Sequence, residues 1–376
     1  MSVDLIVRRG RILCFRLLDI GDEVLLDAAE RTMARAEDAK RLKLSRAASM
    51  ALVFKSPPLD VSLGTRALPL LPGGGAAEVA VSARVFDHGN VSLRFELPIA
   101  PGTPLVDLVP LCDELYESEL LSEESRRDAV ALVARLGTNV VRPHTWSDVE
   151  TYTVIFVEEL DGHPTAKEVL AQDVLPKLLL GERSPRPISE GVRGEMHRHA
   201  YSYLDDDLVL IDWDSAFVLE PSGSRDVPDV LELGCGQLQG MRYYDQLMDT
   251  ELGHIYDDVE RANRAGTIQL LWSPYDRVAR AVHERWLDMT EVTERIEASI
   301  KIVGDFYLAR VYRGALERFR VPEWQRAVYR KQQLVAQVYA LLKGQIDTRR
   351  AMLLELTIVL LIALDIVIVL ATKGAH

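Results

Sequence analysis

Residues 352–372 read MLLELTIVLLIALDIVIVLAT, and this stretch decides the architecture that the sequence predicts. It contains two charged side chains, Glu355 and Asp365. As a helix rising about 1.5 Å per residue, about 20 residues cover a hydrocarbon core of about 30 Å. We therefore predict one transmembrane helix over residues 348–372, followed by a short tail at 373–376, which together form a single-pass C-terminal anchor in the lipid bilayer.

The two carboxylates leave a second interpretation open, a helix buried in a protein core, because each acid disfavours membrane insertion by about 2.5–3.5 kcal/mol at mid-helix. Basic residues at both ends of the stretch favour the membrane interpretation. They are Lys343, Arg349 and Arg350 before it and Lys373 after it. Glu355 is close enough to the start to reach the headgroups, whereas Asp365 lies well inside and has no base within a turn of its own helix. Asp365 therefore implies a partner in another chain.

The charge distribution predicts the orientation of the protein. The net charge of the whole chain is −13. Residues 320–350 carry +5 and residues 351–376 carry −1, so the first 319 residues carry the remaining −17. Basic residues next to a membrane span face the cytoplasm, which places the N-terminal body there. A body this acidic is a poor candidate for direct nucleic-acid binding. The three cysteines, Cys14, Cys112 and Cys235, have no metal-ligand spacing, as expected for structural thiols in a reducing compartment.

Residues 1–222 predict an α+β domain with a mixed α/β-sheet body. Residues 4–7 and 11–17 are interpreted as a short hairpin turning at Arg9-Gly10, and 57–77, rich in Pro and Gly, as a loop or linker. The clearest hairpin is 79–86 with 91–97, where apolar residues alternate on both arms. Locally paired strands with helices between them favour this architecture over a doubly wound parallel sheet.

The densest polar cluster is predicted on a hairpin of residues 199–203 and 208–213, and it comprises His197, His199, Asp212 and Asp214. A two-residue loop would set His199 opposite Asp212 and His197 opposite Asp214, forming a metal or acid–base group. A three-residue loop would set Arg198 opposite Asp214, a plain salt bridge. Since Asp-Asp without glycine suits a tight turn poorly, we favour the second register and predict no metal or other cofactor.

Residues 223–347 predict a helical domain of long antiparallel helices that forms a bundle or stalk. One helix is expected from Asp226 to about Arg264, and a near-heptad series from Leu271 to Arg310 predicts a second over about 274–319. Pro322 ends it, and a further helix then continues directly into the membrane stretch. A heptad pattern does not determine how many chains associate, so a coiled-coil homo-oligomer and an intramolecular bundle both remain open.

The order of three C-terminal segments resembles the family called "required for meiotic nuclear division". The segments are DVPDVLELGCGQLQGMRYYDQLMDTELGHIYDDVER (226–261), VPEWQRAVYRKQQLVAQVYALL (321–342) and RRAMLLELTIVLLIALDIVIVL (349–370). Leu354, Glu355 and Asp365 match the pattern of that family's terminal helix. The resemblance implies a C-terminally anchored membrane protein, and a mitochondrial member of the family is implicated in supporting translation at the inner membrane. It implies no catalytic residues.

Three functions fit these observations. The first is a membrane-anchored oligomeric scaffold or tether that binds an unidentified protein partner, because the sequence has no Walker loop, dinucleotide fingerprint, zinc-protease motif or nucleophile elbow. The second is an oligomeric ion channel or transporter with a layout similar to CorA-type magnesium channels, although the Gly-Met-Asn signature of those channels is absent. The third is a metal-dependent enzyme that uses the His/Asp hairpin cluster. We expect the scaffold and no enzymatic activity.

Overall fold

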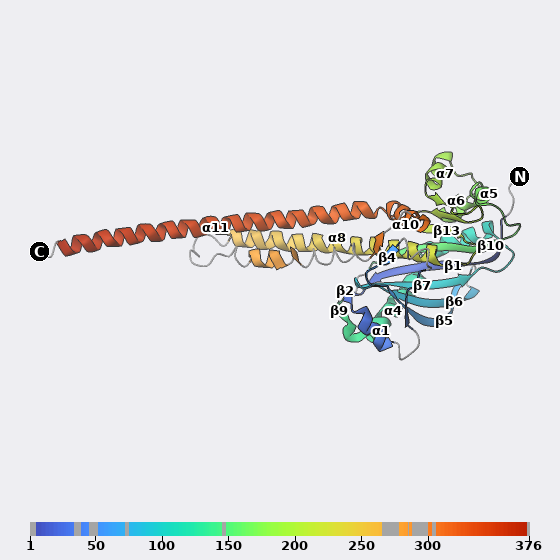
Figure 1. The fold of residues 1–376 in the computed structure, drawn as a ribbon, viewed down its shortest axis with the longest axis horizontal. Coiled ribbons are helices and arrows are strands. Elements are labelled where there is room, and N and C mark those ends of the chain that lie inside the picture. Colours follow the sequence, from blue (N-terminus) through green and yellow to red (C-terminus); the bar gives the residue numbers. More distant parts are fainter. Residues whose placement is uncertain are drawn as a thin grey trace. The chain divides into compact units, whose positions relative to one another are not determined.

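The computed structural model describes residues 5–33, 39–44, 52–71, 75–144, 148–264, 278–284, 286–287, 300–302 and 306–373 (Figure 1). The chain divides into two compact units. The first comprises residues 1–243 and 292–325, and the second comprises 244–291 and 326–376. The expected domain boundary at residues 222–223 lies just before a long helix that begins at Asp226, whereas the compact units divide within that helix, at Tyr243 and Tyr244.

The first unit is built on a mixed ten-stranded sheet (Figure 1). Its strands follow the order β11-β12-β13-β10-β1-β7-β6-β5-β3, and β8 also pairs with β1. Their bounds are β1 Ile6–Asp19, β3 Ala39–Arg41, β5 Leu59–Leu71, β6 Gly75–Val85, β7 Asn90–Pro98, β8 Thr103–Pro104, β10 Glu150–Leu160, β11 Ala200–Tyr201, β12 Leu208–Ile211 and β13 Ser215–Leu219. Of the pairs in this sheet, β10–β13 is parallel and the others are antiparallel. The predicted α+β class is confirmed.

Two small two-stranded sheets are also described in this unit. One pairs β2 (Gly21–Val24) with β9 (Val140–Pro143), and the other pairs β4 (Leu52–Phe54) with β14 (Ile300–Ile302). The β14 strand corrects the prediction of one continuous helix over 274–319. Most of that range lies outside the described residues, but 300–302 are extended, and a separate helix α10 (Tyr307–Arg318) follows.

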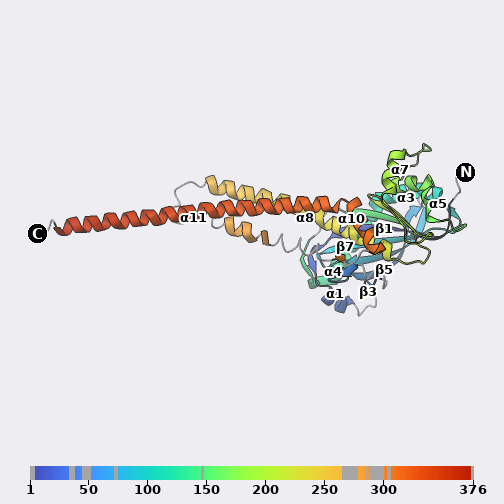
Figure 2. The ribbon, with the colours of Figure 1, turned by 45° about the horizontal axis from the view of Figure 1, so that its top comes forward.

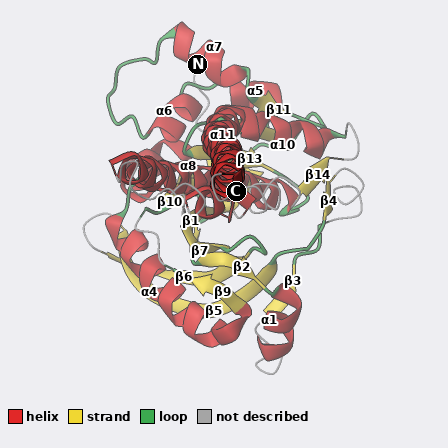
Figure 3. Ribbon diagram, turned by 90° about the vertical axis from the view of Figure 1, so that its left-hand side faces the viewer, coloured by secondary structure: helices red, strands yellow, loops and turns green. Residues whose placement is uncertain are grey.

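Helices cover both faces of the large sheet (Figure 3). The helices described within the first 225 residues are α1 Leu26–Met33, α3 Val109–Tyr116, α4 Glu119–Leu136, α5 Ala166–Leu170, α6 Val174–Leu180 and α7 Glu190–His197, with 3-10 turns at Leu105–Leu108 and Gly137–Asn139. One face of the sheet packs against α3, α4 and α6, where Ile12, Cys14 and Leu18 join the main hydrophobic core. The other face meets the beginning of α8 (Asp226–Arg264), where a Cβ on Gly236 would lie 3.8 Å from Leu17 and 3.4 Å from Phe86.

The hairpin expected at 79–97 is confirmed as β6 and β7, whereas the hairpin expected at Arg9-Gly10 is wrong. Residues 6–19 form one strand, β1, and its pairing with β10 shifts register between Val7, Arg9 and Gly10. A Cβ on Gly10 would lie 2.9 Å from the carbonyl oxygen of Phe156 on the neighbouring strand. Gly10 therefore marks an irregularity where two backbones approach closely, not a turn.

The linker expected at 57–77 is also wrong, because most of it is strand β5. Leu59 and Val61 are buried at odd positions, but Leu68 and Leu70 are buried at even positions. The change follows a register shift between Ser62 and Gly64, where Gly64 has a φ of 88°. This bulge reverses the alternation of buried residues and hides the strand from a period-two search.

The long helices at the C-terminal end agree with the prediction in two places. Residues 226–264 are helical as expected, and the residues that follow, 265–277, lie outside the described part of the chain. Helix α11 is continuous from Val321 to Lys373, so it runs through the apolar stretch as an unbroken helix (Figures 1 and 2). Arg320, with a φ of 60°, separates α10 from α11.

The second unit buries one side of α11 within one chain. Val328, Val335, Leu342 and Ile346 are buried, and Lys331 pairs with Asp245 and Asp249 of α8 at 2.7 Å each. In the earlier part of the heptad series, residues 278–284 are helical and Val282 is buried, while most of its other positions lie outside the described residues. These buried positions are therefore covered within one chain, whereas Phe306, which belongs to the same heptad series, is 48% exposed.

Candidate functional site

The hairpin that carries the predicted His/Asp cluster has a register different from both alternatives. Ala200 pairs with Leu210 and Tyr201 with Val209, so His199 lies opposite Ile211, whose N–H donates to the His199 carbonyl at 3.1 Å. The two strands are joined by a longer loop, 202–207, in which Asp207 Oδ1 accepts hydrogen bonds from the backbone N–H groups of Tyr203 and Leu204 at 2.7 and 2.9 Å. His197 ends α7 as an exposed residue, so it has no place in the strand.

The carboxylate of Asp212 is paired with an arginine from a distant helix. Arg318 of α10 donates through Nε to Asp212 Oδ1 at 3.0 Å and forms a second, shorter contact through Nη2. The backbone N–H of Trp213 also donates to this oxygen at 2.8 Å. Burial and the nearby Arg318 lower the pKa of His199. Among the described residues, no group of three or more His, Cys, Asp or Glu side chains has the geometry to hold a metal ion. Within the predicted cluster, Asp212 therefore forms a structural ion pair with Arg318.

Five segments of the first unit bring together a second polar group, which the sequence did not single out. We call Asp19, Asp22, His88, His144 and Tyr243 the histidine cluster. Asp19 ends β1, Asp22 lies in β2, His88 lies in the β6–β7 turn, His144 follows β9 and Tyr243 lies on α8.

Backbone hydrogen bonds hold these segments together. The N–H of Ile20 donates to the carbonyl of Gly89 at 3.0 Å, and that of His144 donates to Ile20 at 3.1 Å. Gly89 has a φ of 90°, and a Cβ there would lie 1.6 Å from the carbonyl oxygen of Gly21. A glycine is required because the turn both takes a left-handed conformation and packs directly against another backbone.

His144 links two aspartates. Its Nε2 lies 2.5 Å from Asp19 Oδ1, while its Nδ1 lies 3.2 Å from the Arg142 carbonyl oxygen and 3.6 Å from Asp22 Oδ1. Each ring nitrogen therefore lies close to a carbonyl or carboxylate oxygen, an arrangement that favours the doubly protonated imidazolium. The Tyr243 ring stacks on it with centroids 5.1 Å apart, a position that favours a cation.

Burial acts on both partners of this ion pair. Burial alone lowers the pKa of His144, but the Asp19 carboxylate, the Arg142 carbonyl and Asp22 outweigh it and raise the pKa above its usual value. Burial raises the pKa of Asp19, and His144 opposes that rise. The pair therefore compensates a carboxylate whose side chain has no exposed surface.

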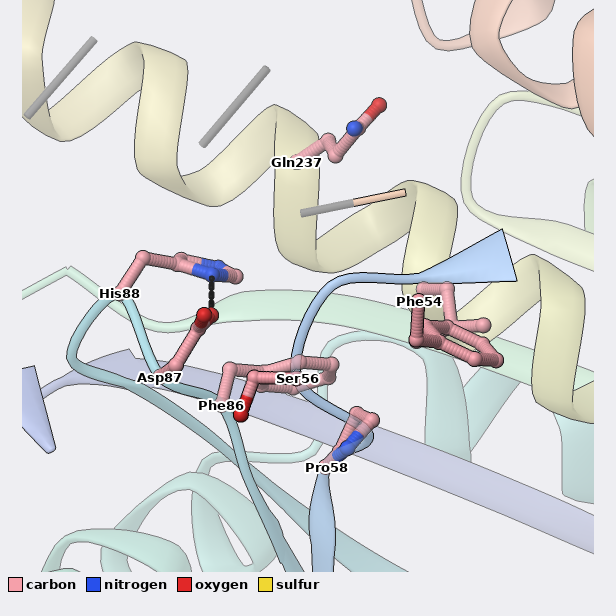
Figure 4. Close-up of a pocket in the computed structure, with 8 residues that line it drawn as sticks. Phe54, Ser56, Pro58, Phe86, Asp87, His88 and Gln237 are labelled. Atoms are coloured by element: carbon pink, nitrogen blue, oxygen red, sulfur yellow. Dashed lines mark hydrogen bonds and ion pairs between the residues drawn. The ribbon is translucent and has the colours of Figure 1, made fainter. Parts of the chain in front are cut away.

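His88 borders a small hollow beside this cluster (Figure 4). Its Nδ1 lies 3.2 Å from Asp87 Oδ1, and its buried Nε2 has no hydrogen-bond partner among the described residues. The hollow is lined by Phe54, Ser56, Pro58, Phe86, Asp87, His88, Leu233 and Gln237. An imidazole oriented by a carboxylate can transfer protons. The hollow has room for about one water molecule, so it does not admit an organic substrate in this conformation.

A buried ion-pair cluster ties the sheet to α8. We use this term for Arg84, Arg94, Asp60, Asp229 and Glu232. Arg84 lies 2.7 Å from Asp60, 3.1 Å from Asp229 and 2.8 Å from Glu232, and Arg94 lies 2.9 Å from both Asp60 and Glu232. Burial raises the pKa of Glu232, whereas the two arginines lower it. With two cations and three acids joining β5, β6 and β7 to α8, this cluster is a structural connection.

The apolar stretch of α11 is long enough and apolar enough to cross a membrane by length and composition, and it is the one such helix in the described part of the chain. Both Glu355 and Asp365 are exposed on it. Lys343 and Arg350 are exposed before it, whereas the side chain of Arg349 lies outside the described residues.

Sequence reasoning missed the histidine cluster because its members are far apart in the chain. Asp19 and His144 are separated by 125 positions, and nothing local in either segment indicates the pairing. The hairpin predicted from 79–86 and 91–97 implies a turn at Asp87-His88-Gly89-Asn90, but a glycine in a turn does not indicate that a second backbone, at Gly21, lies against it.

Comparison with known proteins identifies the family of the first unit. Residues 9–225 match the family described as "Uncharacterized protein MJ0711, N-terminal domain". Over 225 residues the chain is 25% identical to the uncharacterized protein MJ0711 of Methanocaldococcus jannaschii, a match that spans 59% of this chain and 66% of that protein. No solved structure matches this chain. The family match ends before the segments that carry the resemblance at 226–370, so that resemblance stays a prediction. Since the family match covers more than half of the residues of this chain, the chain belongs to the MJ0711 N-terminal domain family.

Proposed function

We propose that the protein is a single-pass membrane protein whose N-terminal domain acts as a scaffold, with the apolar stretch of α11 as its anchor. The observation that carries the proposal is the exposure of this stretch. Its most apolar 18-residue window has a mean hydropathy of 2.6, and none of the window is buried within the chain.

The energetic argument is simple. Leu354 and Leu360 are 67% and 63% exposed, and other Leu, Ile and Val side chains of the stretch are exposed to similar degrees. Burying one such side chain stabilises it by about 1.5–3 kcal/mol relative to water, so leaving a whole span in water costs tens of kcal/mol. The interpretation as a helix buried in the chain's own core does not fit this exposure. A lipid bilayer supplies the apolar surroundings that the chain does not.

The orientation that we propose places the N-terminal body in the cytoplasm. It rests on the basic residues ahead of the stretch, Lys343, Arg349 and Arg350, which favour the cytoplasmic side of a span.

A scaffold role is supported by apolar side chains exposed beside the β11–β12 hairpin. Tyr203 and Leu204 are 69% and 61% exposed, and Trp213 after β12 is about half exposed. Large aromatic residues on a surface are the usual anchors of protein interfaces. The resemblance of residues 226–370 makes translation at a membrane the first process in which to look for the partner.

Carbonate washing of membranes that contain the full-length chain tests the anchor. We expect the chain in the pellet, and we expect the control variant Leu360→Arg/Leu361→Arg in the supernatant, because two charges at mid-helix add about 5–7 kcal/mol to insertion. Recovery of the parent chain in the supernatant would contradict the anchor.

Thiol labelling tests the orientation. The native cysteines are buried, so Val130→Cys, at a position 62% exposed on α4, supplies a reactive thiol in the body. An impermeant maleimide should label this variant in inverted vesicles and not in right-side-out vesicles.

Crosslinking in native membranes identifies the partner. We expect Trp213→Ala and Tyr203→Ala/Leu204→Ala to weaken the crosslink. Ion flux in liposomes that contain the purified chain would instead support the channel.

A further inference from the structure

We propose that Asp365 is the residue through which copies of this chain associate within the membrane, an inference that rests on the proposed membrane span. Asp365 is exposed on α11, and no hydrogen bond or ion pair to it is found within the described residues. Its neighbours one turn away, Leu361, Ile362 and Ile368, are aliphatic. A carboxyl group in hydrocarbon without a hydrogen-bond partner is costly, so acids inside membranes face other helices.

The contrast with Glu355 identifies Asp365 as the important acid. Glu355 lies near the start of the apolar stretch, within reach of the headgroup region. Ten residues at about 100° each place it about 80° around the helix from Asp365. The two acids therefore belong to different faces and different depths, and Asp365 alone needs a partner inside the hydrocarbon.

A second copy of the chain fits that need by geometry. Every copy carries the same body and the same basic residues before the apolar stretch, so all copies insert in one orientation. Parallel insertion sets Asp365 of each copy at the same depth. A protonated carboxyl of one copy can then donate a hydrogen bond to the carboxyl or carboxylate of the other, an arrangement known from paired aspartates. A partner of a different sequence would need a polar group that happens to lie at this depth.

The membrane helices must make this contact themselves. Apolar side chains of α11 before the stretch, Val335 and Leu342 among them, are already buried within one chain. Around Asp365, the same face carries Ile358 and Leu361, which can pack against their counterparts in another helix.

The test measures association of the full-length chain in lipid vesicles by single-molecule photobleaching, at equal protein-to-lipid ratios. We expect the parent to be oligomeric and Asp365→Leu to associate about tenfold more weakly, as for the loss of an interhelical hydrogen bond. Asp365→Asn should retain association, because an amide can also pair with itself. Two matched controls, Val367→Leu at similar depth and Glu355→Gln, should behave as the parent does.

Disulfide crosslinking maps the face. Ile358→Cys and Leu361→Cys lie within about 40° of Asp365, whereas Leu356→Cys and Ala363→Cys lie about 160–180° away at similar depths. We expect crosslinked dimers from the first pair only, and their loss when Asp365→Leu is added.

The outcomes separate this proposal from the anchor. A parent chain extracted by carbonate refutes the membrane span. A parent that stays in the membrane but is monomeric, or that associates equally as Asp365→Leu, overturns the role of Asp365 and leaves the span intact. A purified monomer that crosslinks at Leu361→Cys to a different protein in native membranes overturns the second copy as partner.

Discussion

His144 Nε2 lies 2.5 Å from Oδ1 of Asp19, a carboxylate whose side chain has no exposed surface. The His144 imidazole is 27% exposed, so a partly exposed cation neutralises the fully buried Asp19 carboxylate. This pairing joins the end of β1 to the segment after β9 in the family domain. Its energetic role is to make burial of Asp19 tolerable, because an unpaired buried charge is strongly destabilising.

The titration of His144 should depend on Asp19. Since Asp19, the Arg142 carbonyl and Asp22 together raise the His144 pKa against the effect of burial, we expect its NMR titration midpoint above the usual value of about 6.5. Asp19→Asn should lower that midpoint, and Asp22→Asn should lower it less, because Asp22 lies 3.6 Å from Nδ1. An unchanged midpoint in Asp19→Asn would contradict the ion pair.

The sign of the matching stability effect follows from linkage. A histidine whose pKa is raised by folding stabilises the domain fully below its unfolded pKa of about 6.5, and this contribution is lost as the pH rises through the folded pKa. The difference in stability between the parent and His144→Gln should therefore shrink over that interval.

Gly89→Ala should destabilise the protein more than Gly102→Ala. Both glycines have a φ of 90°, so the conformational cost is matched. A Cβ at position 89 would lie 1.6 Å from the Gly21 carbonyl oxygen, whereas nothing lies within 4 Å of one at position 102. We expect a further loss of about 2 kcal/mol from the clash. Thermal unfolding in detergent, followed by labelling of the buried cysteines, measures the difference, and equal midpoints would show that the turn can move away from Gly21.

Arg84→Met should lower the unfolding temperature strongly. It leaves the fully buried Glu232 with one arginine in place of two, and breaking such a cluster costs about 3–5 kcal/mol, on the order of 10 °C. The control is Arg126→Met, which removes an exposed pair with Glu119 worth at most about 1 kcal/mol. Similar midpoints for the two variants would mean that solvent reaches the buried cluster.

Removing Arg318 should affect the domain through Asp212. Arg318→Met leaves that buried carboxylate with one backbone donor, for a loss of about 1–3 kcal/mol, whereas Arg320→Met removes an exposed pair with Glu323 and should change little.

The metal content of the purified chain should be the same in the parent and in His197→Ala/His199→Ala. Stoichiometric zinc that disappears in the double variant would restore the metal-enzyme hypothesis.

The sequence by itself determined the features that depend on local order. Apolar length alone indicated the terminal helix, alternation indicated β6 and β7, and continuous helical periodicity indicated α8 over residues 226–264. These signals lie within a few turns or one hairpin, so neighbouring residues are enough to read them.

Only the tertiary structure decided the features that depend on distant contacts. The bulge at Gly64 hid strand β5 from sequence reasoning, and the loop 202–207, held by Asp207, set a β11–β12 register that does not pair His199 with Asp212. Arg318 reached Asp212 across 106 positions and His144 reached Asp19 across 125. The physical reason is that a buried charge is stabilised by whichever opposite charge the fold brings within about 3 Å, and a linear sequence does not encode which distant segment that will be.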